Sequence, residues 1–247
     1  MRLIQGLAAV VLMGSAALAN AEVTGTVTAV SDYNFRGVSL SASDPALQGS
    51  IDWAAENGFY LGAWASNIDY GDDVDGNIEL DLYGGFAGEF SEGFGYDLGI
   101  VWYLYPDSSE NRSRCRDLGR DCEISDYPEI YAGVTWQWLE LKQWYTNDYS
   151  GTDEDGWYTE ANGTFELPAN FGLNLHVGYN YGDVFDDTEF FDYSIGVSYT
   201  LGNFDLGLAW VATDLDRGDS AFSSDDVFNT QGRAIFSVST TFPWGAE

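Results

Sequence analysis

The chain has 247 residues and a formal net charge of −31, with only nine Lys or Arg residues. Binding to nucleic acid needs a basic surface, so this charge excludes nucleic acid as a partner. Aromatic residues make up 16% of the chain, which excludes the disorder typical of acidic sequences with few aromatics. The length suits one large β domain or two small domains.

Residues 1–21 are typical of a secretory signal peptide. Arg2 supplies a positive charge, and the apolar stretch 3–18 that follows is too short to favour a membrane-spanning helix. Two Ala-x-Ala triplets predict cleavage after Ala19 or Ala21, which leaves residues 22–247 as the mature domain. No later segment approaches eighteen continuous apolar residues. The exported chain is therefore expected to be either soluble or inserted as a β-barrel.

Large apolar residues alternate with small or polar ones along most of the mature chain. In FDYSIGVSYTLGNFDLGLAW, residues 191–210, the alternation continues on both sides of Gly202-Asn203, a pair that favours a type II′ turn. Repeats of this pattern predict twelve antiparallel strands and no helix. The strands are expected near 23–36, 46–55, 58–69, 77–88, 94–105, 128–137, 139–149, 157–167, 172–182, 190–201, 203–212 and 228–242. Near 138–149, Lys142 and Gln143 interrupt the alternation and suggest a bulge, and the strand count is most open there to a difference of one hairpin.

The connections between these strands alternate in length. Every odd-numbered connection is long and every even-numbered one is short, as in bacterial outer-membrane barrels with short periplasmic turns. The apolar faces are therefore expected to face lipid, and we predict an all-β fold, a transmembrane antiparallel up-and-down β-barrel of about twelve strands. A soluble β protein is the alternative. Aromatic residues near the strand ends fit interfacial girdles: Tyr33, Phe35, Tyr70, Tyr103, Tyr105, Trp157, Tyr158 and Phe171.

Five segments carry a resemblance to a known family: VSDYNFRGVSLS at 30–41, Pro45, Gln48-Gly49, GFYLGAWASNID at 58–69 and ELDLYGGFAG at 79–88. They resemble the TorF-type porin family of proteobacteria, over essentially the whole mature chain. The resemblance implies an outer-membrane barrel with a channel role, in a Gram-negative cell, and names no substrate. Outer-membrane barrels often end on an aromatic residue that the insertion machinery recognises. Here five residues follow Phe242, so we expect the insertion signal in the strand that ends there.

Side chains of the opposite parity are expected to face the lumen. The pore-lining candidates are Asp32, Arg36, Asp52, Glu79, Asp81, Asp97, Glu129, Glu160, Glu166, His176, Asp192, Asp205 and Arg233, with Lys142 as a further basic candidate. Charged side chains in a pore set ion selectivity by the sign of their field, so the excess of acids predicts a cation-preferring channel. Carboxylates that raise each other's pKa or pair with donors would make this preference mild.

Arg36 and Arg233 lie on the first and last predicted strands, which become neighbours when the barrel closes. We expect the two side chains near one another toward the outer rim. One alternative is a basic patch that binds or orients an anionic group. The other is that each arginine pairs with nearby acids and stiffens the wall.

The third long loop contains both cysteines, Cys115 and Cys122, with six residues between them. In an exported protein a disulfide is expected, and closing so short a loop contributes roughly 2–3 kcal/mol. A metal site is the weaker alternative, since no His or further Cys lies nearby. Four arginines surround the pair: Arg112, Arg114, Arg116 and Arg120. Three placements stay open for this basic loop: inside the mouth, outside against anionic lipopolysaccharide or solute, or free in solvent.

No catalytic or cofactor motif stands out. His176 is the single histidine, and its parity places it with Asn174 and Asn180 on the inward face, away from lipid substrates. The acidic loops 71–77, 151–156 and 183–189 lack the EF-hand pattern, which leaves weak divalent binding or simple solvation. We therefore expect no enzyme and no cofactor, but an outer-membrane channel for passive diffusion of ions or small polar solutes. The alternative is a non-conducting barrel with a structural, adhesin or receptor role through its outer loops.

Overall fold

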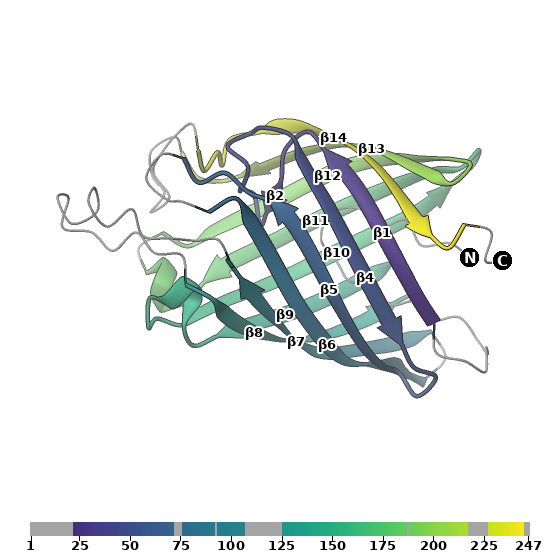
Figure 1. The fold of residues 1–247 in the computed structure, drawn as a ribbon, viewed down its shortest axis with the longest axis horizontal. Helices are drawn as coiled ribbons and strands as arrows, with labels where there is room; N and C mark the ends of the chain where they lie inside the picture. The colour runs from purple at the N-terminus through teal and green to yellow at the C-terminus, as the bar shows by residue number, and fades with distance from the viewer. Residues whose placement is uncertain are drawn as a thin grey trace.

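The computed structural model describes residues 22–71, 76–91, 93–106, 125–186, 188–216 and 227–244. Twelve strands close into one antiparallel barrel, in which β1 pairs with β14 and every other pair consists of consecutive wall strands (Figure 1). The predicted fold class is confirmed. The wall strands are β1 (Glu22–Val30), β4 (Ala46–Ala54), β5 (Phe59–Asn67), β6 (Ile78–Ser91), β7 (Phe94–Leu104), β8 (Tyr127–Trp136), β9 (Leu139–Thr146), β10 (Gly156–Leu167), β11 (Phe171–Tyr181), β12 (Phe190–Leu201), β13 (Phe204–Thr213) and β14 (Arg233–Phe242).

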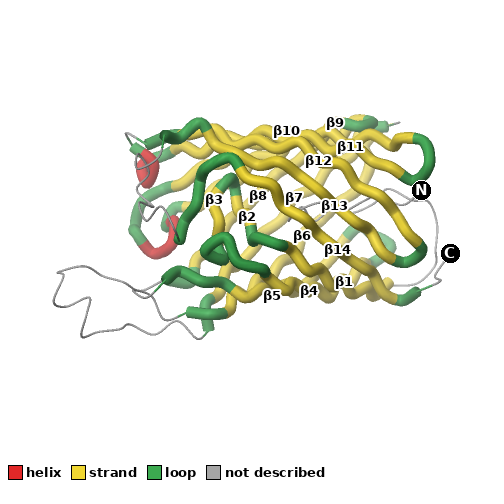
Figure 2. Tube along the Cα trace, turned by 90° about the horizontal axis from the view of Figure 1, so that it is seen from above, coloured by secondary structure: helices red, strands yellow, loops and turns green. Residues whose placement is uncertain are grey.

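The smaller elements lie in the long connections. Two short strands, β2 (Asn34–Phe35) and β3 (Val38–Ser39), form a separate two-stranded sheet. Single 3-10 turns follow β9 and β11, η1 (Tyr149–Gly151) and η2 (Asp183–Phe185). Within the described ranges, no helix is long and apolar enough to cross a membrane. The strand starts and ends place all the short turns at one end of the barrel, together with the start of β1 and the end of β14 (Figures 1 and 2).

Every predicted wall strand is present, but the first and last are shorter than expected. β1 ends at Val30, which pairs with both Ala46 and Ser237, whereas the sequence predicted a strand to residue 36. Beyond Val30 the backbone N–H of Tyr33 donates to Ser41 Oγ at 2.8 Å, so the chain folds back on itself instead of continuing in the wall. β14 begins at Arg233 instead of residue 228.

The sequence also suggested a bulge near residues 138–149, because Lys142 and Gln143 interrupt the alternation. This prediction is wrong: β9 pairs with β8 and β10 in continuous register. Lys142 points into the barrel with a side chain only 2% exposed. Gln143 points outward, where its Oε1 accepts a hydrogen bond of 2.6 Å from Thr159. The register shift occurs instead between β6 and β7, at Glu89/Ser91.

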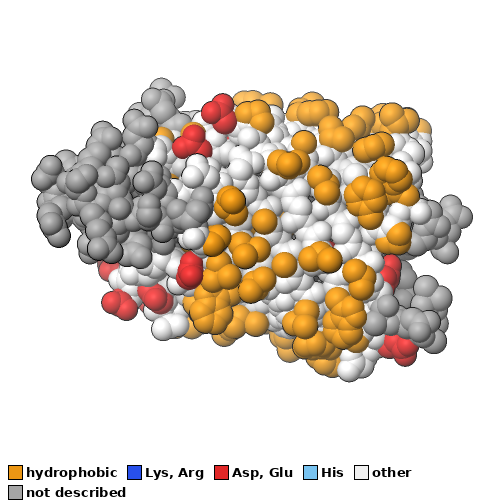
Figure 3. Space-filling model, viewed as in Figure 1, with side chains coloured by type: hydrophobic (Ala, Val, Ile, Leu, Met, Phe, Trp, Pro, Cys, Tyr) orange, Lys and Arg blue, Asp and Glu red, His pale blue; other side chains and the backbone are white. Residues whose placement is uncertain are grey.

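The outer surface of the wall is apolar. Leu47, Ile51, Ile195 and Leu208 are between 54% and 63% exposed, and hydrophobic side chains spread over the strands of the face seen in Figure 3. A soluble monomer rarely exposes so much contiguous apolar surface, whereas a barrel in a bilayer presents it to hydrocarbon. The structure therefore has the form of a transmembrane barrel.

The aromatic girdles differ from the prediction. Five of the expected girdle residues lie inside the barrel with 2–9% exposure: Tyr33, Tyr70, Tyr103, Tyr105 and Tyr158. Tyr103 and Tyr105 have the same parity as Asp97, and that parity is inward. Phe171 does face outward, with 45% exposure. At the short-turn end, outward ring pairs such as Phe94–Trp136 (5.7 Å between centroids) and Trp138–Phe165 (4.9 Å) form an aromatic band.

Candidate functional site

The candidate site is the segment 31–45, which connects β1 to β4 and folds into the barrel; we call it the inner hairpin. β2 and β3 are its two arms, paired through Asn34–Ser39 and Phe35–Val38. Arg36 and Gly37 form its tip, with φ angles of 48° and 86°. Positive φ at both central positions is what a type I′ hairpin turn requires, and glycine supplies it without strain.

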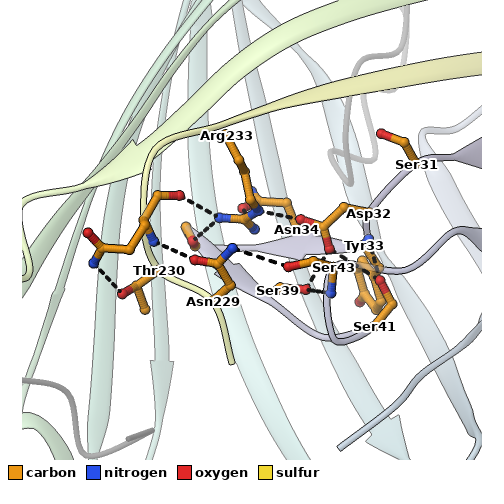
Figure 4. Close-up of polar contacts among 12 residues, drawn as sticks. Ser31, Asp32, Tyr33, Asn34, Ser39, Ser41, Ser43, Asn229, Thr230 and Arg233 are labelled. Atoms are coloured by element: carbon orange, nitrogen blue, oxygen red, sulfur yellow. Dashed lines mark hydrogen bonds and ion pairs between the residues drawn. The ribbon is translucent and has the colours of Figure 1, made fainter. Parts of the chain in front are cut away.

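The root of the inner hairpin is held by Arg233 at the start of β14 (Figure 4). Its Nε donates to a carboxylate oxygen of Asp32, its Nη2 donates to Asn34 Oδ1 at 2.8 Å, and its Nη1 donates to the carbonyl of Gly37 at 3.1 Å. One guanidinium thus joins the base, an arm and the tip of the hairpin to the barrel wall. Such charge-assisted contacts are the strongest class of hydrogen bond in proteins.

Serine side chains and Asn229 add further hydrogen bonds at the root of the hairpin (Figure 4). We call these contacts, together with those of Arg233, the clasp. Asp32 Oδ1 accepts from Ser39 Oγ at 2.5 Å and from Ser41 Oγ at 3.2 Å. The backbone N–H of Ser39 donates to the carbonyl of Asn229 at 2.9 Å, and Asn229 Nδ2 donates to Ser43 Oγ at 3.2 Å. Ser39 and Ser41 are 0% and 1% exposed, so the centre of the clasp is buried between the hairpin and the connection that precedes β14, while Ser43 at its edge is exposed.

The tip of the inner hairpin crosses the lumen. Arg36 donates through both Nη atoms to Glu129 of β8, at 2.9 and 2.5 Å, and the side chains are 7% and 1% exposed. In the barrel order β8 is separated from β1 by four strands on one side and six on the other. The tyrosine hydroxyl of Tyr103 donates to the same carboxylate at 3.0 Å, and Arg36 lies 4.3 Å from the ring centroid of Tyr158. The hairpin therefore connects opposite sides of the wall through a buried bidentate ion pair.

Gly37 packs against a third part of the wall. A Cβ atom at this position would lie 2.4 Å from Thr213 Cγ2 and 2.7 Å from Asp192 Cβ. The tip thus touches β12 and β13 as well as β8. Around it lies a tyrosine-rich cluster that contains Tyr33, Tyr103 and further buried rings from the loop-end half of the barrel. Together the hairpin and this cluster occupy the loop end of the lumen.

Two other charged networks line the inward face nearby. Lys142 Nζ lies 3.2 Å from Asp97 Oδ2, and Tyr60 donates to the other oxygen of this carboxylate at 2.6 Å. His176 Nε2 is 2.8 Å from Asp192 Oδ1, and its Nδ1 is 2.7 Å from Asn162 Oδ1. His176 on β11 thus joins side chains of its two neighbouring wall strands, β10 and β12.

The remaining candidate residues are dispersed. Asp52 accepts from Ser50 at 2.8 Å, Glu160 from Trp144 at 2.7 Å and Asp205 from Thr200 at 2.6 Å. Glu166 is exposed near the turn end of β10. Glu79 and Asp81 are different, because Glu79 Oε2 and Asp81 Oδ1 are buried and have no hydrogen-bond partner among the described residues.

Arg36 and Arg233, which the sequence predicted to lie near one another, bind at the tip and at the root of the inner hairpin. Arg36 and Arg233 both bind the inner hairpin to the wall and both pair with acids, so neither presents the free basic patch that was one of the two alternatives. The pattern did not reveal the hairpin itself, nor Tyr103 and Asn229 as members of its network. Arg-Gly within VSDYNFRGVSLS is the one local turn signal. Cys115, Cys122 and the basic loop lie outside the described residues, and the disulfide stays a prediction.

Comparisons with known proteins agree on the fold. The KdgM porin matches with a TM-score of 0.54 and 8% identity, over 90% of this chain and 99% of that chain. The NanC porin matches at 0.55 and 9% identity, over 90% and 100% of the two chains. An outer membrane channel from Pseudomonas putida F1 matches at 0.52 and 12% identity, over 94% and 98%. At such identities the likeness establishes a shared barrel fold.

The sequence comparisons place the chain among related proteins without giving it an activity. No curated protein matches it. A sequence model of the family described as "Bacterial protein of unknown function (Gcw_chp)" matches residues 15–242, which is most of the chain. The protein therefore belongs to this bacterial family.

Proposed function

We propose that the protein is a porin-like channel of a Gram-negative outer membrane, of the TorF type, which passes ions or small polar solutes by passive diffusion. The closed barrel with an apolar exterior and a polar, charged interior supports this proposal. The fold it shares with the KdgM and NanC porins supports it further. Catalysis is no part of the proposal, and no cofactor is needed for diffusion.

The observation that carries the proposal is the closed barrel with a charged interior, and the inner hairpin sets the size of solute that the channel would admit. A twelve-stranded barrel is wider than the small barrels that side chains alone can fill. A segment that crosses the lumen and is tied to β8 and β14 narrows it from within. We infer a bore that admits ions and the smallest polar solutes, set by how tightly the hairpin stays bound.

The charge of the lumen supports cation preference. The described ranges contain three Lys or Arg side chains, Arg36, Lys142 and Arg233, and each lies within 4 Å of an acid. Several inward acids have no Lys or Arg partner among the described residues: Asp52, Glu79, Asp81, Glu160, Asp192 and Asp205. The interior field is therefore negative, which favours cations.

The same proposal covers the partners. The apolar wall would contact outer-membrane lipid, the basic third loop would lie near lipopolysaccharide or solute, and the strand that ends at Phe242 would be recognised by the barrel insertion machinery.

A non-conducting barrel with a structural or loop-binding role is the second candidate. The observation that favours it is the same hairpin, because a hairpin that never leaves its clasp would plug the loop end.

Ion current across a planar bilayer separates these functions. The refolded full mature chain is inserted under a salt gradient, and we expect discrete current steps with a reversal potential of cation-selective sign. A variant with Asp52→Asn and Asp205→Asn should move the reversal potential toward zero. Protein that is verified as inserted but gives no steps would reject the channel and favour the non-conducting barrel.

A further inference from the structure

Glu79 and Asp81 form an acidic pair beside the inner hairpin, in which Glu79 is buried and Asp81 is partly buried. They are two residues apart on β6 and so point to the same, inward face of the wall. Glu79 is 1% exposed, and its Oε1 accepts a hydrogen bond of 3.2 Å from Tyr33 of the hairpin. Its Oε2 and Asp81 Oδ1 have no partner within the described part of the chain. A buried ionised carboxylate is strongly destabilised unless a cation or donors compensate it.

No Lys or Arg side chain of the described ranges forms an ion pair with Glu79 or Asp81. Arg36 binds Glu129, Arg233 binds Asp32, and Lys142 lies between Asp97 and Glu140. These contacts use all three Lys and Arg side chains that the structure describes. Within the described part of the chain, compensation for Glu79 and Asp81 is therefore left to a bound cation or to protons.

The surroundings offer oxygen atoms but no strong chelate. Asp81 pairs in register with Tyr103 on one side and Trp64 on the other, and Glu79 pairs with Ser66. Among the described residues, no group of three or more His, Cys, Asp or Glu side chains could hold a metal ion. Ca²⁺ takes six to eight oxygen ligands and Zn²⁺ takes four nitrogen or sulfur-rich ones, so neither fits two carboxylates and hydroxyls.

We propose that Glu79 and Asp81 bind one small monovalent cation, such as Na⁺ or K⁺, against the inner hairpin. Two carboxylates supply the charge, and neighbouring hydroxyls supply neutral oxygen ligands. Conduction requires a site that attracts an ion and still releases it, and a weak site of this kind meets both conditions. Its role as a step in conduction rests on the proposed channel function, whereas the binding itself does not.

The unfolding midpoint of the full mature chain in detergent tests the binding directly. NaCl is compared with N-methyl-D-glucamine chloride at the same ionic strength and a fixed alkaline pH. At a Na⁺ concentration about tenfold above Kd, we expect the wild-type midpoint to be roughly 3–6 °C higher in NaCl. Glu79→Gln with Asp81→Asn should abolish this difference. Glu56→Gln, in the exposed turn between β4 and β5, removes one acid outside the barrel and should keep it.

The outcomes separate the site from the channel. Equal midpoints of the wild type in the two salts would overturn the site and leave the carboxylates neutralised by protons. A difference that survives in the Glu79→Gln, Asp81→Asn variant would also overturn it, since the cation would then bind elsewhere. Sodium-dependent stability without bilayer current would support the site and reject the channel. Current without sodium-dependent stability would support the channel and reject the site.

Discussion

Removal of the Arg36 side chain should release the tip of the inner hairpin from the wall. Arg36→Ala deletes both hydrogen bonds to Glu129, at 2.9 and 2.5 Å, and leaves a carboxylate that is 1% exposed without its cation. Breaking a buried ion pair by removing one partner costs about 3–5 kcal/mol. At about 1.4 kcal/mol for each factor of ten, local opening of the hairpin should become roughly 100- to 4,000-fold more frequent.

Amide hydrogen exchange measures this opening. Within the hairpin the N–H of Ser39 donates to Asn229 at 2.9 Å, and the N–H of Leu40 donates to Tyr33 at 2.7 Å. Both amides should lose protection by the factor given above, while the amides of the wall strands keep theirs. Lys142→Met is the matched control, since it breaks a buried ion pair to Asp97 that does not involve the hairpin. Unchanged protection of residues 33–41 in Arg36→Ala would refute the Arg36–Glu129 ion pair as a contact that holds the hairpin in place.

Three further results are expected. Gly37→Ala forces a Cβ to within 2.4 Å of the wall at a φ of 86°, so chemical unfolding should show a loss of about 1–3 kcal/mol; an unaffected midpoint would contradict the packing of the tip. A thiol assay should find Cys115 and Cys122 unreactive until reductant is added, and two reactive thiols at the outset would exclude the disulfide. A hydrogen bond and the charge of Asp155 raise the pKa of Asp183. The protonated form is thus favoured in the fold, and exchange protection of the turn at η2 should be highest below the ordinary aspartate pKa. It should fall as the pH rises through the raised value, and Asp183→Asn should remove this dependence.

The wall could be predicted from the sequence because a lipid-facing surface imposes a strict pattern. Most outward positions of a strand such as β11 are apolar, as Leu173, Leu175 and Val177 are, while the inward positions accept Asn174 and His176. This period-two pattern fixed the number, order and approximate bounds of the strands. It also identified the inward parity of most acids that the structure places on the inner face.

The inner hairpin could not be predicted in the same way. Tyr33 and Phe35 continue the alternation of β1, and the pattern does not distinguish a ring that faces lipid from one packed inside the barrel. Arginine at a positive φ is uncommon, so Arg36 gave no turn signal of its own. Its partner Glu129 is 93 residues away in the chain, and no local pattern encodes a contact of that range.

The inward tyrosines show a signal that parity did contain. Tyr103 at the end of β7 and Tyr105 just after it are in phase with Asp97, which assigns them to the lumen, yet their position at a strand end favoured a girdle. Strand ends that border a lumen filled by a folded segment carry aromatic residues for packing. The alternation along the strand therefore predicted which way these tyrosines face better than their position at the strand end did.

The central claim is that the inner hairpin sets the bore of a channel, and single-channel conductance tests it most directly. Val30 pairs in register with Ala46, so a tight turn of about four residues can replace residues 31–45 and still join β1 to β4. The account predicts small current steps from the wild type and steps several-fold larger from the variant with the short turn. Equal conductance from both proteins, each verified as inserted, would contradict it.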